Sequence, residues 1–129
     1  FFKQKTAYEL RLSLVGSEMC IETDISSTAS IWGNSQYPIY SASKAALNVF
    51  SRSLAKSFEK TALQMLTICP GPTNTPMREK LAKDSINHQD PSIIGEAILQ
   101  FILKKTDYKN GDVVIIRDGR ESLYSSLTD

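Results

Sequence analysis

Tyr40 and Lys44, four positions apart, are the pair of side chains in this sequence best suited to acid-base chemistry. Both lie at the start of residues 40–60, a stretch without proline or glycine that we predict to be a helix. On a helix, side chains at positions i and i+4 project from one face, one turn apart. An ammonium held beside a phenol favours the phenolate, so this tyrosine could donate or accept a proton near neutral pH.

Two other segments have to meet this helix if the pair is to act on a substrate. Ser27 precedes Tyr40 by thirteen residues and follows residues 24–26, which we interpret as the short end of a strand, most of which is missing. Residues 63–69 form a largely apolar run that predicts a buried parallel strand, and a turn rich in proline follows at residues 70–77. Ligands of open parallel sheets bind outside the carboxyl ends of the strands, where this turn falls.

The order and spacing of the serine, the Tyr-x-x-x-Lys pair and the Pro-Gly turn resemble the C-terminal half of a short-chain dehydrogenase/reductase. The resemblance implies an α/β fold, namely the C-terminal part of a Rossmann-like doubly wound parallel sheet whose N-terminal half is missing. Residues 24–129 would then be the C-terminal portion of a single NAD(P)-binding catalytic domain. The glycine-rich turn that such a domain places after its first strand has no counterpart in this sequence.

The resemblance also implies roles for individual residues. Tyr40 would exchange a proton with the substrate oxygen, Ser27 would hydrogen-bond that oxygen, and Lys44 would support Tyr40 and contact the nicotinamide ribose. The cofactor would be NAD or NADP, and the reaction a hydride transfer to or from a small carbonyl or alcohol substrate. The residues expected to contact the cofactor are Tyr40, Lys44, Pro70, Gly71, Thr73 and Thr75.

Three functions remain open from the sequence. The first is a truncated dehydrogenase or reductase of the short, single-domain branch; the second is an extended relative such as a sugar epimerase or dehydratase. The third is a non-catalytic binding protein that retains the fold. The short stretch after Gly71 favours the first, because extended relatives carry a larger C-terminal substrate domain. Without its N-terminal half, the chain as given is expected to be inactive and poorly stable, since an apolar strand edge is left unpaired.

Residues 1–23 do not fit the rest of the chain. Residues 3–9 and 14–21 resemble translations of sequencing-library adapters, in the order in which such adapters are joined. We therefore interpret residues 1–23 as a non-native artefact segment and exclude them from the fold prediction. The alternative is a genuine N-terminal arm.

Composition narrows the class of partner and the compartment. The 15 basic and 14 acidic residues nearly cancel, so neither a nucleic acid nor a membrane partner is indicated, and no apolar run approaches the length of a membrane span. Cys20 and Cys69 lack metal-ligand spacing and fit a reducing, cytoplasmic setting. No metal site is expected, and His88 is expected to be an exposed loop residue.

The remaining elements are predicted from their periodicity. A loop at residues 31–39 leads into the helix at 40–60, and short and longer helices follow at 77–83 and from Pro91. An Asn-Gly turn precedes a strand at 112–116, and residues 121–129 are expected to be a polar tail. In the helix from Pro91, the expected buried stripe is Ile94, Ala97, Ile98, Phe101 and Ile102. In the helix at 40–60, the stripe expected to meet the core or a second subunit of a homodimer or homotetramer is Ala45, Ala46, Val49, Phe50, Leu54, Ala55 and Phe58.

Overall fold

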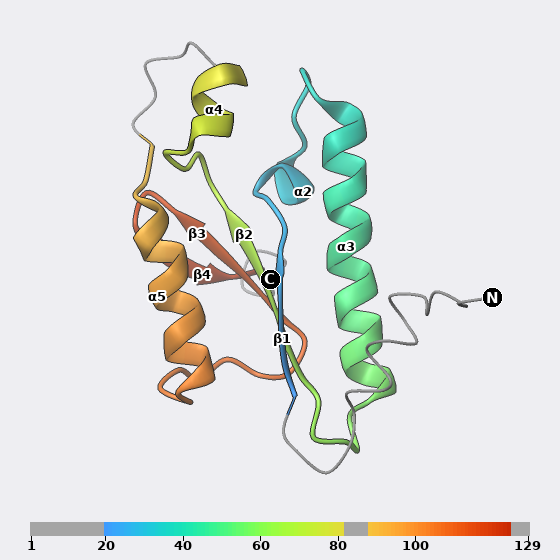
Figure 1. Cartoon of the computed structure of the whole chain (residues 1–129). Helices are drawn as coiled ribbons and strands as arrows, with labels where there is room; N and C mark the ends of the chain where they lie inside the picture. The colour runs from blue at the N-terminus through green and yellow to red at the C-terminus, as the bar shows by residue number, and fades with distance from the viewer. Residues whose placement is uncertain (1–19, 82–87, 125–129) are drawn as a thin grey trace, which may run out of the picture.

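Three parallel strands and one antiparallel strand form a single sheet in the order β1-β2-β3-β4 (Figure 1). The structure is a computed structural model, and it describes residues 20–81 and 88–124. The strands are β1 (Ile21–Ile25), β2 (Gln64–Pro70), β3 (Asp112–Arg117) and β4 (Arg120–Leu123). The predicted α/β fold with a mainly parallel sheet is confirmed.

The helices cover both faces of this sheet. α3 (Pro38–Ser57) connects β1 to β2 on one face, and α5 (Pro91–Ile102) connects β2 to β3 on the other (Figure 1). Two short helices, α2 (Ala29–Trp32) and α4 (Pro76–Leu81), follow the carboxyl ends of β1 and β2. Helices on both faces bury both sides of β2 and β3, which explains the continuous apolar runs of these strands.

Each face of the sheet carries an apolar core, because successive side chains of a strand point to opposite faces. The buried cluster beneath α5 consists of Leu66, Ile68, Ala97, Phe101, Val114 and Ile116. The buried cluster beneath α3 consists of Leu54, Ala55, Leu63 and Met65. Two expectations change at the helices: Ile102, predicted to be buried, is 44% exposed, and the helix predicted at 40–60 begins at Pro38 and ends at Ser57.

The face that α3 turns toward the sheet is polar in its first half. Its buried residues are Ser41, Asn48, Ser51, Leu54 and Ala55. Ser51 donates a hydrogen bond to the carboxylate of Asp24 on β1, so polar side chains pair across this part of the interface. Val49 and Phe50, from the predicted apolar stripe, are 64% and 46% exposed.

The first strand is longer than predicted. β1 begins at Ile21 rather than Asp24, and its five residues pair in parallel with β2 from Ile21 opposite Gln64 to Ile25 opposite Ile68. The strand therefore has five residues in the structure, rather than only the short end that the sequence analysis expected. β1 therefore crosses the boundary that the sequence analysis places between residues 23 and 24. The artefact origin of the residues before the strand stays a prediction.

The C-terminal region differs from the expected polar tail. β4 pairs with β3 through a tight turn at Asp118 and Gly119, whose φ angles are 53° and 70°. Two successive residues with positive φ, occupied by Asp-Gly, match the type I′ turn that joins antiparallel strands. The Asp-Gly signal was present, but the polar residues of β4 obscured the strand that follows it. Leu123 packs against the cluster beneath α5.

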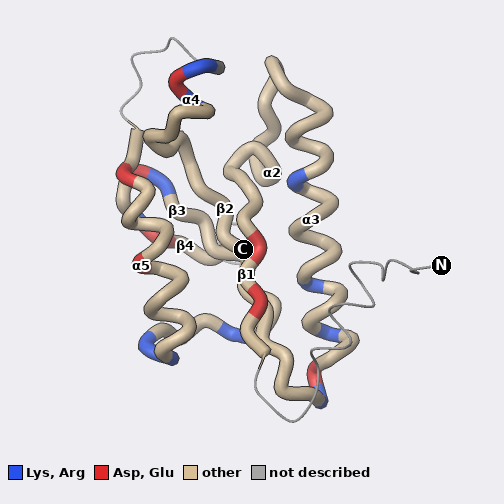
Figure 2. The backbone as a smooth tube through the Cα atoms, in the orientation of Figure 1, with Lys and Arg blue, Asp and Glu red and all other residues tan. Residues whose placement is uncertain are grey.

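Charged residues are distributed over several elements, as Figure 2 shows for α3, α4, α5 and β1. Among residues 20–81 and 88–124, no helix is long and apolar enough to cross a membrane. The predicted short helix at 77–83 is observed as α4, and its last two predicted positions lie outside the described residues.

Candidate active site

The predicted catalytic residues come from two neighbouring elements at the carboxyl end of β1. Ser27 follows β1, while Tyr40 and Lys44 lie in the first two turns of α3. The chain on either side of Ser27 is fixed to β2, because Ser26 N donates to Ile68 O at 2.7 Å and Thr28 N donates to Pro70 O at 2.9 Å. The sheet pairing thus continues past the end of β1 and holds Ser27 at the sheet edge.

Lys44 connects α3 to β1 through both its side chain and its backbone. Its Nζ donates to the backbone oxygen of Ile25 at 2.9 Å. In the opposite direction, the hydroxyl of Ser26 donates to the backbone oxygen of Lys44 at 3.1 Å. Ser26 is buried, so this second bond lies between helix and strand. The two bonds fix the second turn of α3 against the strand end.

The Tyr40 side chain lies beside this anchor and remains open to solvent. The Nζ of Lys44 is 5.9 Å from the centre of the Tyr40 ring, and the tyrosine is 46% exposed. The helical spacing therefore brings the phenol and the ammonium together, as the sequence predicted. An exposed phenol beside a fixed cation can exchange a proton with a bound molecule.

In the part of the chain that the structure describes, the Ser27 hydroxyl proton has no acceptor and is left to donate. Its Oγ accepts a hydrogen bond from the backbone N of Ala29 at 3.1 Å. A hydroxyl has one donor and two acceptor positions, so this contact leaves the donor available. Ser30 connects Ser27 to α3, because its hydroxyl donates to Ser27 O and accepts from Asn48 Nδ2 at 2.8 Å. Asn48, buried on α3, was not identified from the sequence; its place one turn after Lys44 was the available signal.

The turn after β2 is fixed to the end of β3. Gly71 N donates to Ile116 O at 2.8 Å, and the Thr73 hydroxyl donates to Gly71 O at 2.9 Å. Thr75 accepts a bond from Arg78 N at 3.3 Å at the start of α4. Pro70, the last residue of β2, starts this turn at the sheet edge that also holds Ser27.

Gln89 holds this turn from the other side and was missed by the sequence analysis. Its backbone N donates to Pro72 O, and Asn74 N donates to its backbone oxygen, both at 2.9 Å. Its side-chain Nε2 donates to Thr73 Oγ1 at 3.3 Å and to Ile116 O at 3.0 Å. Gln89 is only 8% exposed, and its side-chain bond to Ile116 O is buried. A lone glutamine far along the chain gives no local signal for such contacts.

His88 differs from the expectation of an exposed loop residue. It is half-buried, and its Nε2 accepts a hydrogen bond from Arg78 Nε at 3.5 Å. Within the described ranges, no group of three histidine, cysteine, aspartate or glutamate residues could hold a metal ion. Cys20 and Cys69 are free thiols, and Cys69 is fully buried.

Comparison with known proteins agrees with this architecture. The family model described as short chain dehydrogenase matches residues 23–86. Carbonyl reductase family member 4 of Danio rerio is 29% identical over 107 residues, which cover 78% of this chain and 44% of the relative. The 15-hydroxyprostaglandin dehydrogenase [NAD(+)] of Rattus norvegicus is 32% identical over 112 residues, covering 80% of this chain and 41% of the relative.

A solved structure shows the same fold. The 3-ketoacyl-(acyl-carrier-protein) reductase from Brucella melitensis, complexed with NADH, superposes with a TM-score of 0.73 at 18% identity. The match covers 88% of this chain and 49% of the reductase.

The described residues thus form part of a doubly wound α/β fold with a serine, a tyrosine and a lysine at the carboxyl edge of its sheet. The chain belongs to the short-chain dehydrogenase/reductase family. It spans less than half the length of the relatives it matches.

Proposed function

We propose that this chain is the C-terminal catalytic portion of an NAD(P)-dependent oxidoreductase acting on a small carbonyl or alcohol. The observation that carries the proposal is the anchored pair at the start of α3, where the Lys44 ammonium is bonded to Ile25 O beside the exposed ring of Tyr40. The names of its relatives, a carbonyl reductase and an NAD-dependent dehydrogenase, support the same class of reaction.

In this proposal each side chain has a separate task. In the reductive direction Tyr40 gives its hydroxyl proton to the substrate oxygen as the carbonyl carbon becomes tetrahedral, and takes it back in oxidation. Ser27 donates its free hydroxyl hydrogen to the same oxygen and stabilises the developing negative charge. Lys44 places its ammonium beside the Tyr40 ring and, through its bond to Ile25 O, fixes the part of α3 that carries the tyrosine.

The turn after β2 provides groups that suit a nicotinamide cofactor. Within the described ranges, the backbone N–H of Thr73 has no hydrogen-bond acceptor, although the turn is fixed on both sides. A fixed, free N–H is suited to the carbonyl oxygen of a carboxamide. The residues proposed to hold the cofactor, NAD or NADP, are Tyr40, Lys44, Pro70, Gly71, Thr73 and Thr75. When bound, the cofactor supplies or receives the hydride.

The wider context of the protein follows from the same proposal. The outer face of α3 exposes Ile39 and Val49 by 84% and 64%. An apolar helix face of this kind suits a subunit interface, and we assign the whole protein to homodimers or homotetramers.

Free thiols fit a reducing compartment, and we place the protein in the cytoplasm. The chain alone, at less than half the length of its relatives, is proposed to be inactive.

A tyrosine exchange in the completed protein tests the proposal. The full coding sequence of the source would be expressed, and carbonyl reduction measured with NADH and NADPH. Tyr40→Phe should lower kcat by roughly 10²–10⁴-fold, the range of general acid-base catalysis. Tyr37→Phe is the matched control, because Tyr37 is similarly exposed, at 40%, one turn earlier. Undiminished reduction by Tyr40→Phe would overturn the assignment.

A further inference from the structure

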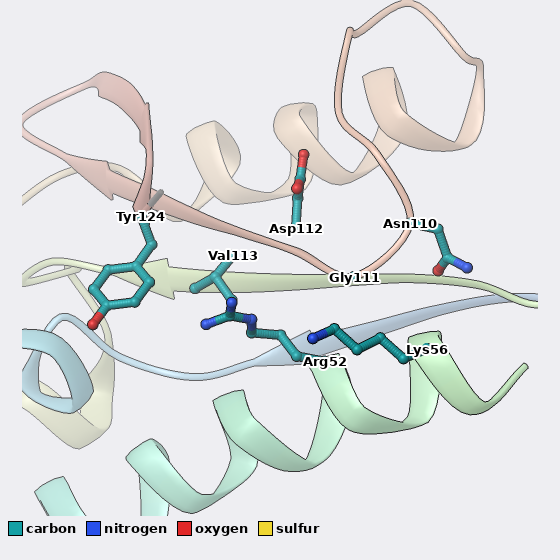
Figure 3. A pocket seen from close by; sticks show the side chains of 7 residues that line it. All are labelled: Arg52, Lys56, Asn110, Gly111, Asp112, Val113 and Tyr124. Carbon is teal, nitrogen blue, oxygen red and sulfur yellow. The ribbon is translucent and has the colours of Figure 1, made fainter. Parts of the chain in front are cut away.

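A cavity of about 470 Å³ lies between the second half of α3 and the start of β3, away from the carboxyl edge that holds Tyr40. Figure 3 shows that Arg52 and Lys56 reach from α3 toward β3 on one side of it, with Tyr124 at one end. The two cations are four positions apart and therefore stand one helical turn from each other. Small-molecule sites commonly have volumes of about 300–1,000 Å³, so the space is sufficient for a small ligand.

Among the described residues, no acidic side chain pairs with the positive charge in this cavity. In the part of the chain that the structure describes, neither Arg52 nor Lys56 has an ion-pair or hydrogen-bond partner. Asp112 borders the cavity, but its side chain points away from the two cations in Figure 3. Its carboxylate accepts a hydrogen bond from Lys109 N at 2.8 Å. Two adjacent cations without a counter-charge favour a doubly charged anion.

The remaining walls are fixed and suit an organic group. Val113, 5% exposed, belongs to the buried cluster of Cys69 and Ile115, against which Tyr124 also packs. Asn110 is rigid, because its side chain accepts from Met65 N at 2.8 Å and donates to Leu63 O at 3.2 Å. An apolar wall beside two cations can hold a ligand that is apolar at one end and anionic at the other.

We infer that this cavity is a binding site for a phosphate monoester with a small apolar or aromatic group. Arg52 and Lys56 bind the phosphate, Arg52 with the paired donors of its guanidinium, while Val113 and Tyr124 contact the organic part. The inference does not rest on the proposed oxidoreductase function, because Ser27, Tyr40 and Lys44 do not border the cavity.

Titration of the 129-residue chain with phenyl phosphate, followed by amide NMR at constant ionic strength, tests this site. Saturable shifts should centre on Gly111, Val113 and Tyr124, and inorganic phosphate should bind more weakly at the same amides. Arg52→Gln and Lys56→Gln should each weaken binding about tenfold, the loss expected for one charge-assisted contact. Lys105→Gln, which removes an exposed cation near the end of α5, should leave binding unchanged.

The outcomes separate a site from general charge attraction. Shifts that rise linearly and spread over all basic residues would overturn the inference, as would equal weakening by Lys105→Gln and Arg52→Gln. Both α3 variants remove exposed side chains, and a dispersed amide spectrum shows that each is folded. If one variant fails to fold, the other decides the result.

Discussion

The side-chain ammonium of Lys44 donates a hydrogen bond to the backbone carbonyl of Ile25, the last residue of β1, at 2.9 Å. This bond joins the helix that carries Tyr40 to the strand that precedes Ser27. An ammonium has three N–H donors, so two remain for other acceptors. In the function proposed above, Lys44 would fix the geometry of the site and still contact the hydroxyl groups of a bound ribose.

Replacing Lys44 with methionine should lower stability a little and catalysis much more. Lys44→Met keeps the unbranched stem but removes the bond to Ile25 O and the charge beside Tyr40. We expect the chain to lose about 0.5–1.5 kcal/mol of unfolding free energy, the net value of one hydrogen bond, measured by urea unfolding. In the completed protein, the loss of kcat should be much larger, about 10²-fold or more.

Lys44→Arg is the control for charge. Arginine keeps the cation, but its planar group cannot reproduce the compact three-donor ammonium. It should restore part of the stability and little of kcat. If Lys44→Met changes neither the unfolding free energy nor kcat, the hydrogen bond from Lys44 to Ile25 O has no energetic role.

Ser26 and Ser27 are adjacent, but replacement by alanine should affect stability at Ser26 and catalysis at Ser27. Ser26 is buried and bonds to Lys44 O, so Ser26→Ala should cost about 1 kcal/mol of unfolding free energy. Ser27 is half-buried, and its hydroxyl accepts a hydrogen bond from Ala29 N. Ser27→Ala should therefore affect stability less and kcat of the completed protein more. The reverse pattern would show that the two serines have been assigned the wrong way round.

Gln89 should tolerate an apolar replacement better than an acidic one. Its two side-chain N–H groups point at oxygen acceptors, Thr73 Oγ1 and Ile116 O, and Gly71 N also donates to Ile116 O. Gln89→Leu should cost about 1 kcal/mol, because Ile116 O keeps one donor. Gln89→Glu should cost more, because it places a buried carboxylate against two acceptors.

Urea unfolding of both Gln89 variants at pH 7 measures this order. The two replacements change side-chain volume little, so the comparison isolates the donor groups. A Gln89→Glu chain as stable as the parent would mean that the side-chain hydrogen bonds of Gln89 do not hold the turn.

The sequence predicted those parts of the fold whose signals are local. β2, β3, α3 and α5 have long apolar patterns or clear proline and glycine boundaries, and all four are observed. The pairing of Tyr40 with Lys44 could be predicted because helical geometry alone brings positions i and i+4 together.

Features that depend on distant partners could not be predicted. Residues 21–23 become strand only through pairing with β2, and the polar β4 only through the Asp-Gly turn back onto β3. The role of Gln89 depends on contacts with a turn sixteen residues earlier in the chain. The apolar pattern of the sequence predicts that Val49 and Phe50 lie on an apolar face of the helix. It does not tell whether other residues cover that face, and in the structure both side chains are exposed.

Gly111→Ala should destabilise the chain through two separate effects. Gly111 has a φ of 87°, which residues with a side chain rarely adopt, and an added Cβ would lie 2.8 Å from the Cβ of Ala55 on α3. We expect a loss of about 1–3 kcal/mol in unfolding free energy. Ala55→Gly in the same chain removes the steric contact but not the backbone strain.

The double variant Ala55→Gly/Gly111→Ala measures the steric part. A coupling energy that recovers part of the loss, beyond the cost of Ala55→Gly alone, would show that contact with α3 limits this position. Additive effects would assign the whole loss to the backbone. An unchanged melting temperature for Gly111→Ala would contradict the close approach of Gly111, just before β3, to Ala55 on α3.

Tyr108 should make the chain less stable in alkali. Partial burial, and next the carboxylate of Glu121 to which its hydroxyl donates, raise the pKa of Tyr108 well above its ordinary value of 10.0. Between these pKa values the unfolded chain loses the phenolic proton while the folded chain keeps it, so the unfolded state binds fewer protons. The contribution of Tyr108 to the unfolding free energy is then constant below about pH 10 and falls as the pH rises further. The slope stays below the limit of about 1.4 kcal/mol per pH unit for one proton, because the ring is partly solvated.

Urea unfolding between pH 8 and 11 checks this contribution in three chains. Tyr108→Phe removes the titrating group, so its unfolding free energy should fall less above pH 10 than that of the parent. Glu121→Gln keeps the phenol and its partial burial but removes the adjacent charge, so it should give an intermediate slope, since burial is the larger cause. If all three chains lose stability in parallel, the alkaline dependence arises from other groups and the Tyr108–Glu121 contact does not contribute to it.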